Sequence, residues 1–357
     1  MPKLYNINDW QERIWFNTGG TRDKKLYINP EDNQQYYFKQ SFKKPGKDYK
    51  YEFWSEIIAY ELGSMCGFNV LPYHIAIRGT DVGCISKSMH TPDTEELVEG
   101  GRYIQAFDNT FNPKDVKLRH QYSFELIMTS LTFLGLQKYH KDFIEVIVFD
   151  ALIGNSDRHQ ENWAIINTHS QISRSLSFVE ILLSQKEHLD KLPRWMKSLL
   201  KKIYTENGNL RPQFRRAKLS MPKETRFSPI YDSGCSFGRE LLDAKVKEML
   251  RDQSQIQKYV TKGVSEIHWQ GKKVSHFVLL QNLLQEEDFR GMVEIPIKRT
   301  LEKFDGQKVV ELINHVDVDL PKDCEYIKIP SERKQLICKL VLSRFNSLKA
   351  FIEEKVK

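Results

Sequence analysis

The chain lacks any long apolar run. The richest apolar stretch among its 357 residues, residues 143–153, is interrupted by Glu145 and Asp150, and the opening MPKLYN has no apolar segment of the kind that directs secretion. Because a helix needs about 20 mostly apolar residues to cross a bilayer, the sequence predicts neither a membrane span nor a secretion signal. We therefore expect a cytoplasmic protein.

Cysteine is also scarce, and its pattern argues against a disulfide framework and a zinc site. The five cysteines are odd in number, scattered and without any C-x-x-C pair: Cys66, Cys84, Cys235, Cys324 and Cys338. We expect reduced, mostly buried thiols. The core must then come from apolar packing, and 40% hydrophobic with 11% aromatic residues suffices for one large or two ordinary domains.

The net charge of +7 is concentrated in one segment. Residues 186–226 hold twelve Lys and Arg against four Asp and Glu, whereas the rest of the chain is nearly neutral. Such a segment can attract an acidic protein, nucleic acid or a membrane surface, and a solvated helix face explains it equally well. The sequence leaves these alternatives open.

A polar loop lies between two apolar runs at residues 149–166, FDALIGNSDRHQENWAII. The helical pattern breaks at Gly154, and a short buried strand is predicted from Trp163, so the polar residues form a loop fixed at both ends. Asp157 and Asn162 have the D-x-x-x-x-N spacing of a kinase catalytic loop, in which the Asp orients the substrate hydroxyl and the Asn binds magnesium. Alone, this spacing arises often by chance.

Phosphate-binding candidates lie nearer the start of the chain. A turn, TGGTRDKK at residues 18–25, joins a strand predicted at 11–17 to one that starts at Leu26. Its glycines would let backbone N–H groups approach phosphate oxygens, and Lys24 or Lys25 would add positive charge. The same residues are also typical of an ordinary tight hairpin. A third strand, residues 35–40, places Lys39 where kinases hold the α- and β-phosphates.

A helix predicted over residues 51–67 follows and carries Glu56, seventeen positions after Lys39. A kinase lysine is positioned by a glutamate of this helix. Strands predicted at 73–77 and 82–87 complete a five-stranded antiparallel sheet with one helix, and the pattern then becomes helical, with long helices over 119–136 and 140–153. We thus predict an α+β, two-lobed kinase-like fold: a sheet lobe over residues 1–88 and a helical lobe over 89–357.

The last motif is PIYDSG at residues 229–234. It places Asp232 where the D-F-G aspartate of kinases coordinates magnesium, and Gly234 allows a sharp turn beside the metal. Asp-Ser-Gly alone is a common turn. The four motifs are stronger together, since they occur in kinase order.

The run LIGNSDRHQENWAI with the downstream PIYD resembles the catalytic signature of the HipA-like serine/threonine kinases. The resemblance implies a catalytic Asp157 with His159 beside it in the loop, and magnesium ligands at Asn162 and Asp232. Further residues are implied to bind ATP: Gly19, Gly20, Thr21, Lys24, Lys39 and Glu56. It also implies autophosphorylation near the phosphate loop, where Thr18 and Thr21 are the hydroxyls.

The chain departs from this family in two respects. It begins about one strand before the phosphate loop, and in this it resembles the short, stand-alone CtkA-like members. By this resemblance, delivery into another cell is the alternative to a cytoplasmic location. Seventy positions separate Asn162 from Asp232, and they contain a predicted basic helical insertion at about 168–226, including a segment at 175–204. Glu161 stands where many relatives have a basic residue.

These observations predict an ATP- and magnesium-dependent kinase that phosphorylates Ser or Thr hydroxyls of proteins, with two magnesium ions. Two alternatives remain. Asp157-Arg158-His159 followed by Asn162 also resembles phosphoinositide kinases, and the basic insertion suits anionic lipid. A nucleic-acid-binding regulator with a vestigial kinase fold is the non-enzymatic alternative.

Overall fold

The computed structural model describes residues 2–13, 24–44, 47–92, 94–112, 120–172, 205–206, 209–210 and 219–353. The chain divides into two compact units: Met1–Met89, Val98–Ile165 and Phe227–Lys357 form the first, and His90–Leu97 with Ile166–Arg226 form the second. No helix in the described part is both long and apolar enough to cross a membrane. The glycine turn with Gly19, Gly20 and Thr21, and the segment 175–204, lie outside the described residues.

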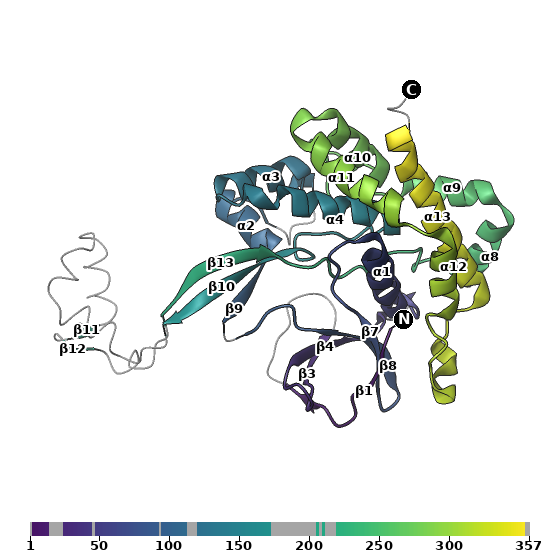
Figure 1. Ribbon diagram of the computed structural model, residues 1–357, viewed down its shortest axis with the longest axis horizontal. Coiled ribbons are helices and arrows are strands. Elements are labelled where there is room, and N and C mark those ends of the chain that lie inside the picture. Colours follow the sequence, from purple (N-terminus) through teal and green to yellow (C-terminus); the bar gives the residue numbers. More distant parts are fainter. Residues whose placement is uncertain are drawn as a thin grey trace. The chain divides into compact units, whose positions relative to one another are not determined.

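The first unit begins with a six-stranded sheet of order β1-β7-β8-β4-β3-β2 (Figure 1). Five strands pair antiparallel as predicted, and the sixth, β1, pairs parallel to β7. The sequence does not reveal β1 because it is three residues long and lacks buried alternation. The strands are β1 (Leu4–Asn6), β2 (Gln11–Glu12), β3 (Lys24–Ile28), β4 (Gln35–Lys39), β7 (His74–Arg78) and β8 (Asp81–Lys87); a separate pair comprises β5 (Lys43–Lys44) and β6 (Lys47–Asp48).

The two faces of this sheet differ in chemistry. Tyr36 and Phe38 of β4 belong to an aromatic cluster with Tyr27 and Trp10 on one face. Because side chains alternate along a strand, Lys39 projects from the opposite face. That face is covered by α1 (Glu52–Cys66), which packs on β8 and, beyond the sheet, against α11 and α12. The alternation of side chains along β4 therefore places Lys39 on the face that contacts α1, the helix that carries Glu56.

Helix α1 ends as the sequence predicts. Gly67 adopts a left-handed conformation with φ 80°, and the Phe68 amide bonds back to the Gly63 carbonyl at 2.8 Å. Glu52 and Glu56 are fully buried in this helix. Buried carboxylates are costly unless they are paired, so both residues require partners in the surrounding structure.

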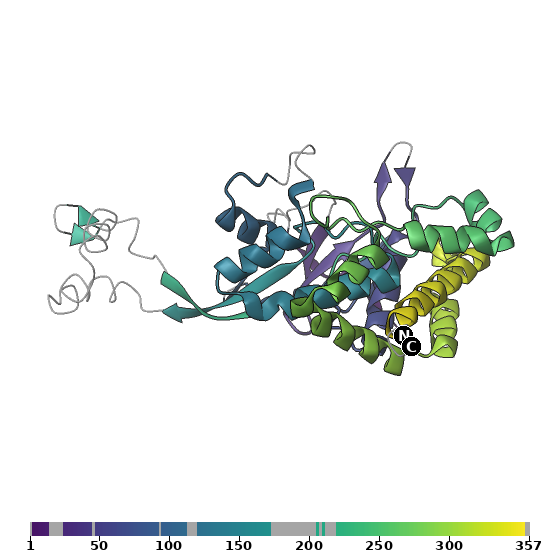
Figure 2. The ribbon, with the colours of Figure 1, turned by 90° about the horizontal axis from the view of Figure 1, so that it is seen from above.

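The rest of the first unit is helical (Figures 1 and 2). Helix α4 (His140–Ile153) is almost wholly buried, has the predicted bounds, and packs against α10, α11 and α13. Helix α3 (Phe124–Phe133) is shorter than the predicted 119–136, because Ser123 caps its start and Gly135 follows its end with φ 72°. The others are α2 (Gly100–Phe107), α8 (Asp243–Arg251), α9 (Gln253–Lys262), α10 (His276–Gln285), α11 (Glu287–Lys303), α12 (Gly306–His315) and α13 (Ser331–Glu353), with the 3₁₀ turns η2 (Gln137–Tyr139) and η4 (Lys322–Ile327).

Strands make up the described part of the second unit. A sheet of order β13-β10-β9 lies mostly within it, formed by β9 (Glu95–Glu99), β10 (Ala164–Ile172) and β13 (Leu219–Phe227); a small pair comprises β11 (Thr205–Glu206) and β12 (Asn209–Leu210). The strand predicted from Trp163 is present from Ala164 and extends to Ile172. The insertion at about 168–226 was predicted to be helical, whereas its described residues belong to β10, β11, β12 and β13. Arg226 of β13 pairs with Glu95 of β9 at 3.0 Å.

Candidate active site

Four predicted residues meet in one ionic cluster. Lys39 of β4 donates to Glu56 of α1 and, at 2.7 Å, to Oδ1 of Asp232. Lys24 of β3 approaches the other carboxylate oxygen of Asp232 at 3.4 Å. The Lys39 and Glu56 side chains are 5% and 0% exposed, so this pair is shielded from water, whereas Asp232 and Lys24 reach the solvent side. The structure thus joins the lysine, the helix glutamate and the Asp-Ser-Gly aspartate.

Glu56 also holds the turn that contains Asp232. Its second oxygen accepts a hydrogen bond from the Ser233 amide at 2.7 Å. A Cβ on Gly234 would lie 3.0 Å from Oε1 of Glu56, so glycine permits the close approach. Asp232 itself has φ 55°, a left-handed conformation that is uncommon for a residue other than glycine. Such strain persists only where the surroundings enforce it, and it is concentrated at functional sites.

The polar loop leaves the end of α4 through a left-handed Gly154, with φ 71°. Asn155 is fully buried; its amide donates to Asp150 at 3.0 Å, and its oxygen accepts from the Asp157 amide at 3.3 Å. The Asn162 side chain donates to the Asp157 carbonyl at 2.7 Å, which closes the loop. The D-x-x-x-x-N residues are therefore held by direct contacts within a loop that is fixed at both ends.

Arg158 is the buried centre of this loop. Its guanidinium forms two hydrogen bonds with Asp150 of α4, at 2.9 and 2.8 Å. It also donates to the backbone carbonyls of Asn162 and Tyr231. Burial alone would lower the pKa of Arg158, but the charge of Asp150 and its hydrogen bonds raise it, so the side chain stays cationic. Arg158 thereby joins the polar loop to the segment that carries Asp232.

Asp157 has a partner from the same segment. The thiol of Cys235 donates to Oδ2 of Asp157 at 3.2 Å, and the guanidinium of Arg239 donates to that sulfur at 2.9 Å. Two hydrogen bonds reinforce this approach, because the Ser156 amide bonds to the Cys235 carbonyl and the Phe237 amide to the Ile153 carbonyl. One carboxylate oxygen of Asp157 is therefore engaged by the thiol.

The predicted site residues have different outcomes. Lys24, Lys39, Glu56 and Asp232 are in contact, and Asp157 contacts Asn162. His159 accepts a hydrogen bond from the Glu161 amide at 3.2 Å, a contact that shapes the loop. Gly19, Gly20 and Thr21 lie outside the described residues.

Sequence reasoning missed other residues of the site, namely Glu52, Asp150, Asn155, Arg158, Cys235 and Arg239. A signal existed for Glu52, which lies four positions before Glu56 and directly precedes the run FWSEII. A charged residue on the core side of a helix needs a partner, and that requirement could have marked it.

The donors suit magnesium, which prefers oxygen ligands and binds through one or two carboxylates together with substrate phosphates. Asp232 already attracts two ammonium groups, which are cations in contact with its carboxylate. The amide nitrogen of Asn162 is committed to the Asp157 carbonyl, which leaves its oxygen as the donor to a metal. Among the described residues no cluster of three or more His, Cys, Asp or Glu side chains could hold a metal by itself, so phosphate oxygens would complete the coordination.

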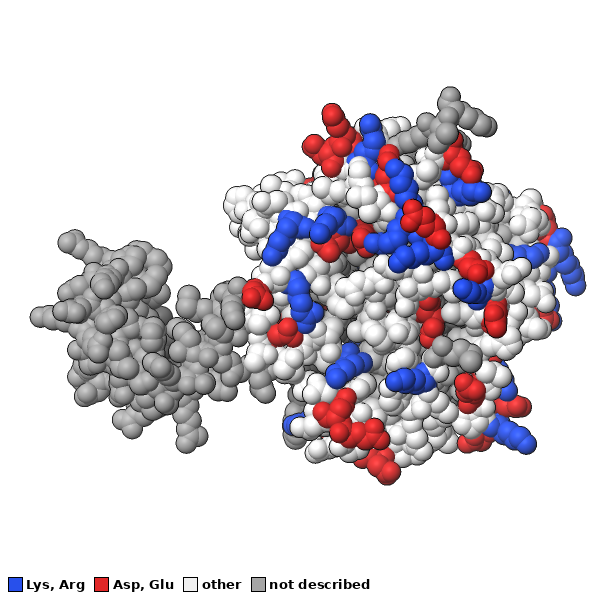
Figure 3. Space-filling model, viewed as in Figure 1, with Lys and Arg blue, Asp and Glu red and all other residues white. Residues whose placement is uncertain are grey.

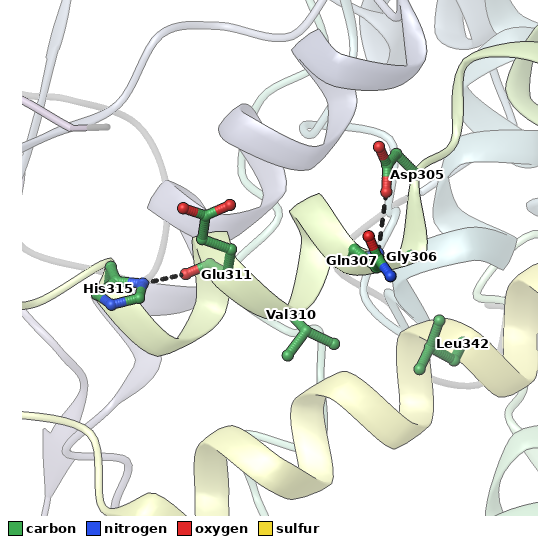
Figure 4. Close-up of a pocket in the computed structure, with 7 residues that line it drawn as sticks. All are labelled: Asp305, Gly306, Gln307, Val310, Glu311, His315 and Leu342. Carbon is green, nitrogen blue, oxygen red and sulfur yellow. Dashed lines mark hydrogen bonds between the residues drawn. The ribbon is translucent and has the colours of Figure 1, made fainter.

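A surface pocket elsewhere in the first unit contains none of these residues. It lies between α12 and α13 and is lined by Asp305, Gly306, Gln307, Val310, Glu311, His315 and Leu342 (Figure 4). Asp305 caps α12 through the amides of Gln307 and Lys308, and the His315 ring bonds to the Glu311 carbonyl at 2.9 Å. Asp305 and His315 thus form hydrogen bonds within α12, and the pocket does not bring together charged side chains as the Lys39, Glu56 and Asp232 cluster does.

Comparison with known proteins shows what the fold resembles. No protein-family model matches the chain, and no curated protein sequence matches it. Among solved structures, the Helicobacter pylori proinflammatory kinase CtkA superposes with a TM-score of 0.66 over 98% of this chain and 99% of that one, at 15% identity. The chain has the fold of CtkA. The predicted α+β, two-lobed, HipA-like kinase fold is thereby confirmed.

A HipA from Shewanella oneidensis MR-1, solved with HipB and operator DNA, is also similar. The match has a TM-score of 0.44 and 11% identity, and it covers 98% of this chain and 68% of that one. At 15% and 11% identity, neither match allows the substrate of the similar protein to be assigned to this chain. The likeness to CtkA therefore concerns the fold, and the chemistry rests on the residues described above.

Proposed function

We propose that this protein is an ATP-dependent kinase that phosphorylates serine or threonine hydroxyls of proteins. The contact of Lys39 with both Glu56 and Asp232 carries the proposal. These three residues come from a strand, a helix and a loop, and Asp232 lies 193 positions after Lys39 in the chain. Kinase chemistry needs this combination: a lysine for phosphate, a glutamate that positions it, and an aspartate for metal. The CtkA-like fold supports the proposal.

The residues divide the work as follows. Bound Mg-ATP would supply the γ-phosphoryl group, with Asp232 and Asn162 as protein ligands of magnesium and Lys39 on the phosphates. Asp157 would accept the proton of the acceptor hydroxyl. The hydroxyl oxygen bonds to the γ-phosphorus while the bond between that phosphorus and the β–γ bridging oxygen breaks, and ADP is released. Because Lys39 and Lys24 contact Asp232 in the structure, they neutralise it before metal arrives.

Labelled ATP with magnesium provides the direct test. We expect transfer to a generic protein acceptor and none to phosphoinositide vesicles. Transfer to the vesicles alone would favour the lipid-kinase alternative, and salt-dependent DNA binding without ATP turnover would favour the regulator.

With no acceptor added, we propose autophosphorylation at Thr18 or Thr21, where phosphate would repel the nucleotide. A mass spectrum of active protein with an unmodified loop would exclude this site.

The two aspartates should respond differently to substitution by asparagine. Asp157→Asn removes the proton acceptor and keeps the shape, so transfer should fall while Mg-ATP binds with near-normal affinity. Asp232→Asn offers a poorer ligand for a hard cation, so nucleotide affinity should lose its magnesium dependence together with activity. Calorimetric titrations with and without magnesium distinguish them, and identical profiles for the two variants would contradict the assigned roles.

A partner for the basic segment 186–226 belongs to the same proposal. Its charge favours an acidic protein or nucleic acid. On the face of the molecule in Figure 3, by contrast, positive and negative side chains of the described residues are interspersed. If replacing Lys197, Lys201 and Lys202 with Ser leaves binding of acidic protein and DNA unchanged at low salt, the segment is only a solvated surface.

A further inference from the structure

Helix α1 carries a second buried glutamate, one turn before Glu56. Glu52 and Glu56 are both fully buried, and their spacing of four places them on one face of the helix. Glu56 holds the turn of Asp232 through the Ser233 amide. Glu52 accepts a hydrogen bond at 3.0 Å from Arg239, which lies in the same segment of the chain. The two glutamates therefore hold opposite ends of this segment.

The contacts of Arg239 continue to the catalytic loop. Its guanidinium lies 4.1 Å from the ring centre of Tyr49, and its second terminal nitrogen donates to the Cys235 sulfur at 2.9 Å. The Cys235 thiol in turn donates to Oδ2 of Asp157 at 3.2 Å. An unbroken series of contacts thus runs from Glu52 on α1 to the aspartate that receives the hydroxyl proton in the proposed reaction.

The backbone keeps this series in place. A hydroxyl of α1, that of Ser55, contacts the Ser236 carbonyl at 3.4 Å. On the other side, the amides of Ser156 and Phe237 form hydrogen bonds that join the segment to the catalytic loop and to the end of α4. The segment from Ser233 to Arg239 is therefore fixed between α1 and the catalytic loop.

We infer that Glu52, Arg239 and Cys235 form a positioning arm for Asp157. The inference rests on the proposed function. Because the thiol holds Oδ2, the carboxylate cannot rotate freely, and Oδ1 remains for the acceptor hydroxyl. Helix α1 then sets both acidic residues of the site: Glu56 acts on Asp232, and Glu52 acts on Asp157 through Arg239 and Cys235. A shift of α1 would disturb metal binding and proton acceptance together.

Steady-state kinetics with a protein acceptor test the arm. Cys235→Ala should lower kcat by roughly 10- to 100-fold, the range associated with misplacing a reacting group by about 1 Å, while KM for ATP stays within about twofold. Cys235→Ser retains an O–H donor and should recover most of the loss. Arg239→Met should resemble Cys235→Ala, and Arg239→Lys should lose less. Transition temperatures measured alongside identify any variant that does not fold.

Arg299→Met is the matched control. Arg299 donates to Glu145 at 3.0 and 2.9 Å and lies 4.9 Å from the ring centre of Phe68, so it also combines a glutamate pair with an aromatic contact. It contacts neither the catalytic loop nor the segment of Asp232 in the described contacts. Its loss should affect stability and leave kcat unchanged. An equal fall in kcat for Arg299→Met would show that the Arg239 effect is general destabilisation.

A double-mutant cycle tests whether the residues act through one series of contacts. Glu52→Gln combined with Cys235→Ala should lower kcat no further than the more severe single variant. Losses that multiply would overturn the arm. The two hypotheses also fail separately: wild-type protein without phosphoryl transfer removes the proposed function and the arm with it, whereas active wild type with a fully active Cys235→Ala variant removes the arm alone.

Discussion

Replacing Lys39 with Met should separate its structural role from its role in binding nucleotide. Its ammonium lies between Glu56 and Asp232, and the Lys39 and Glu56 side chains are 5% and 0% exposed. Removing one partner of a buried ion pair typically costs about 3–5 kcal/mol, because the other charge is left unpaired. Lys24 remains beside Asp232, and Glu56 keeps the Ser233 amide, so we expect the lower end, about 3 kcal/mol in the free energy of unfolding.

The double variant Lys39→Met/Glu56→Gln then distinguishes the two roles. A neutral Gln at position 56 can still accept the Ser233 hydrogen bond without a buried charge, so most of the lost stability should return. Nucleotide affinity should not return, since the lysine contact with phosphate is still missing. A hydrogen bond to a charged group contributes about 1.5–3 kcal/mol, which corresponds to roughly 10- to 100-fold weaker binding.

Urea unfolding followed by tryptophan fluorescence measures the stability, and calorimetric titration with ATP, with and without magnesium, measures the affinity. Lys334→Met is the control: Lys334 forms an ion pair with a buried Asp317 away from the site, so its loss should lower stability and leave nucleotide affinity unchanged. A Lys39→Met variant as stable as wild type would refute the burial argument. A double variant with wild-type nucleotide affinity would refute the phosphate role.

Two further predictions concern the surroundings of the catalytic loop. A Cβ on Gly100 would lie 2.0 Å from the ring of Trp163. Gly100→Ala should therefore lower the free energy of unfolding by about 1–3 kcal/mol and reduce phosphoryl transfer. Gly291 lies in open space within α11, so the control Gly291→Ala should raise the free energy of unfolding by about 0.5–1 kcal/mol. Burial, and next the charge of Glu161, raise the pKa of Glu99 above 4.5, so its ionisation opposes folding. Glu99→Gln should therefore gain stability relative to wild type as the pH rises from below 4.5 through the raised pKa of Glu99. A difference in urea midpoint that is constant with pH would contradict this.

Much of the site was predictable because its residues belong to local patterns. Lys39 ends a strand with alternating β-formers, Glu56 lies on a helix with a marked end at Gly67, and Asp157 with Asn162 follows a mostly apolar helix. Each pattern reports local conformation, and their order along the chain indicates a kinase-like arrangement. That order predicted the pairing of Lys39 with Glu56, whereas the contacts of Asp232 with Lys39 and Lys24 appear only in the folded chain.

Other features needed the tertiary structure. Strand β1 is too short to show a periodic pattern, and its parallel pairing with β7 exists only once the sheet has formed. Glu52, Cys235 and Arg239 carry no motif, because their significance comes from contacts between segments more than 180 positions apart and from the approach of Cys235 to Asp157. Burial decides their energetics, since a charge inside the protein must be paired, and burial is a property of the folded chain. The sequence by itself thus determined which chemical groups are present and in what order, and the packing of α1 against the Asp232 segment decided which of them touch.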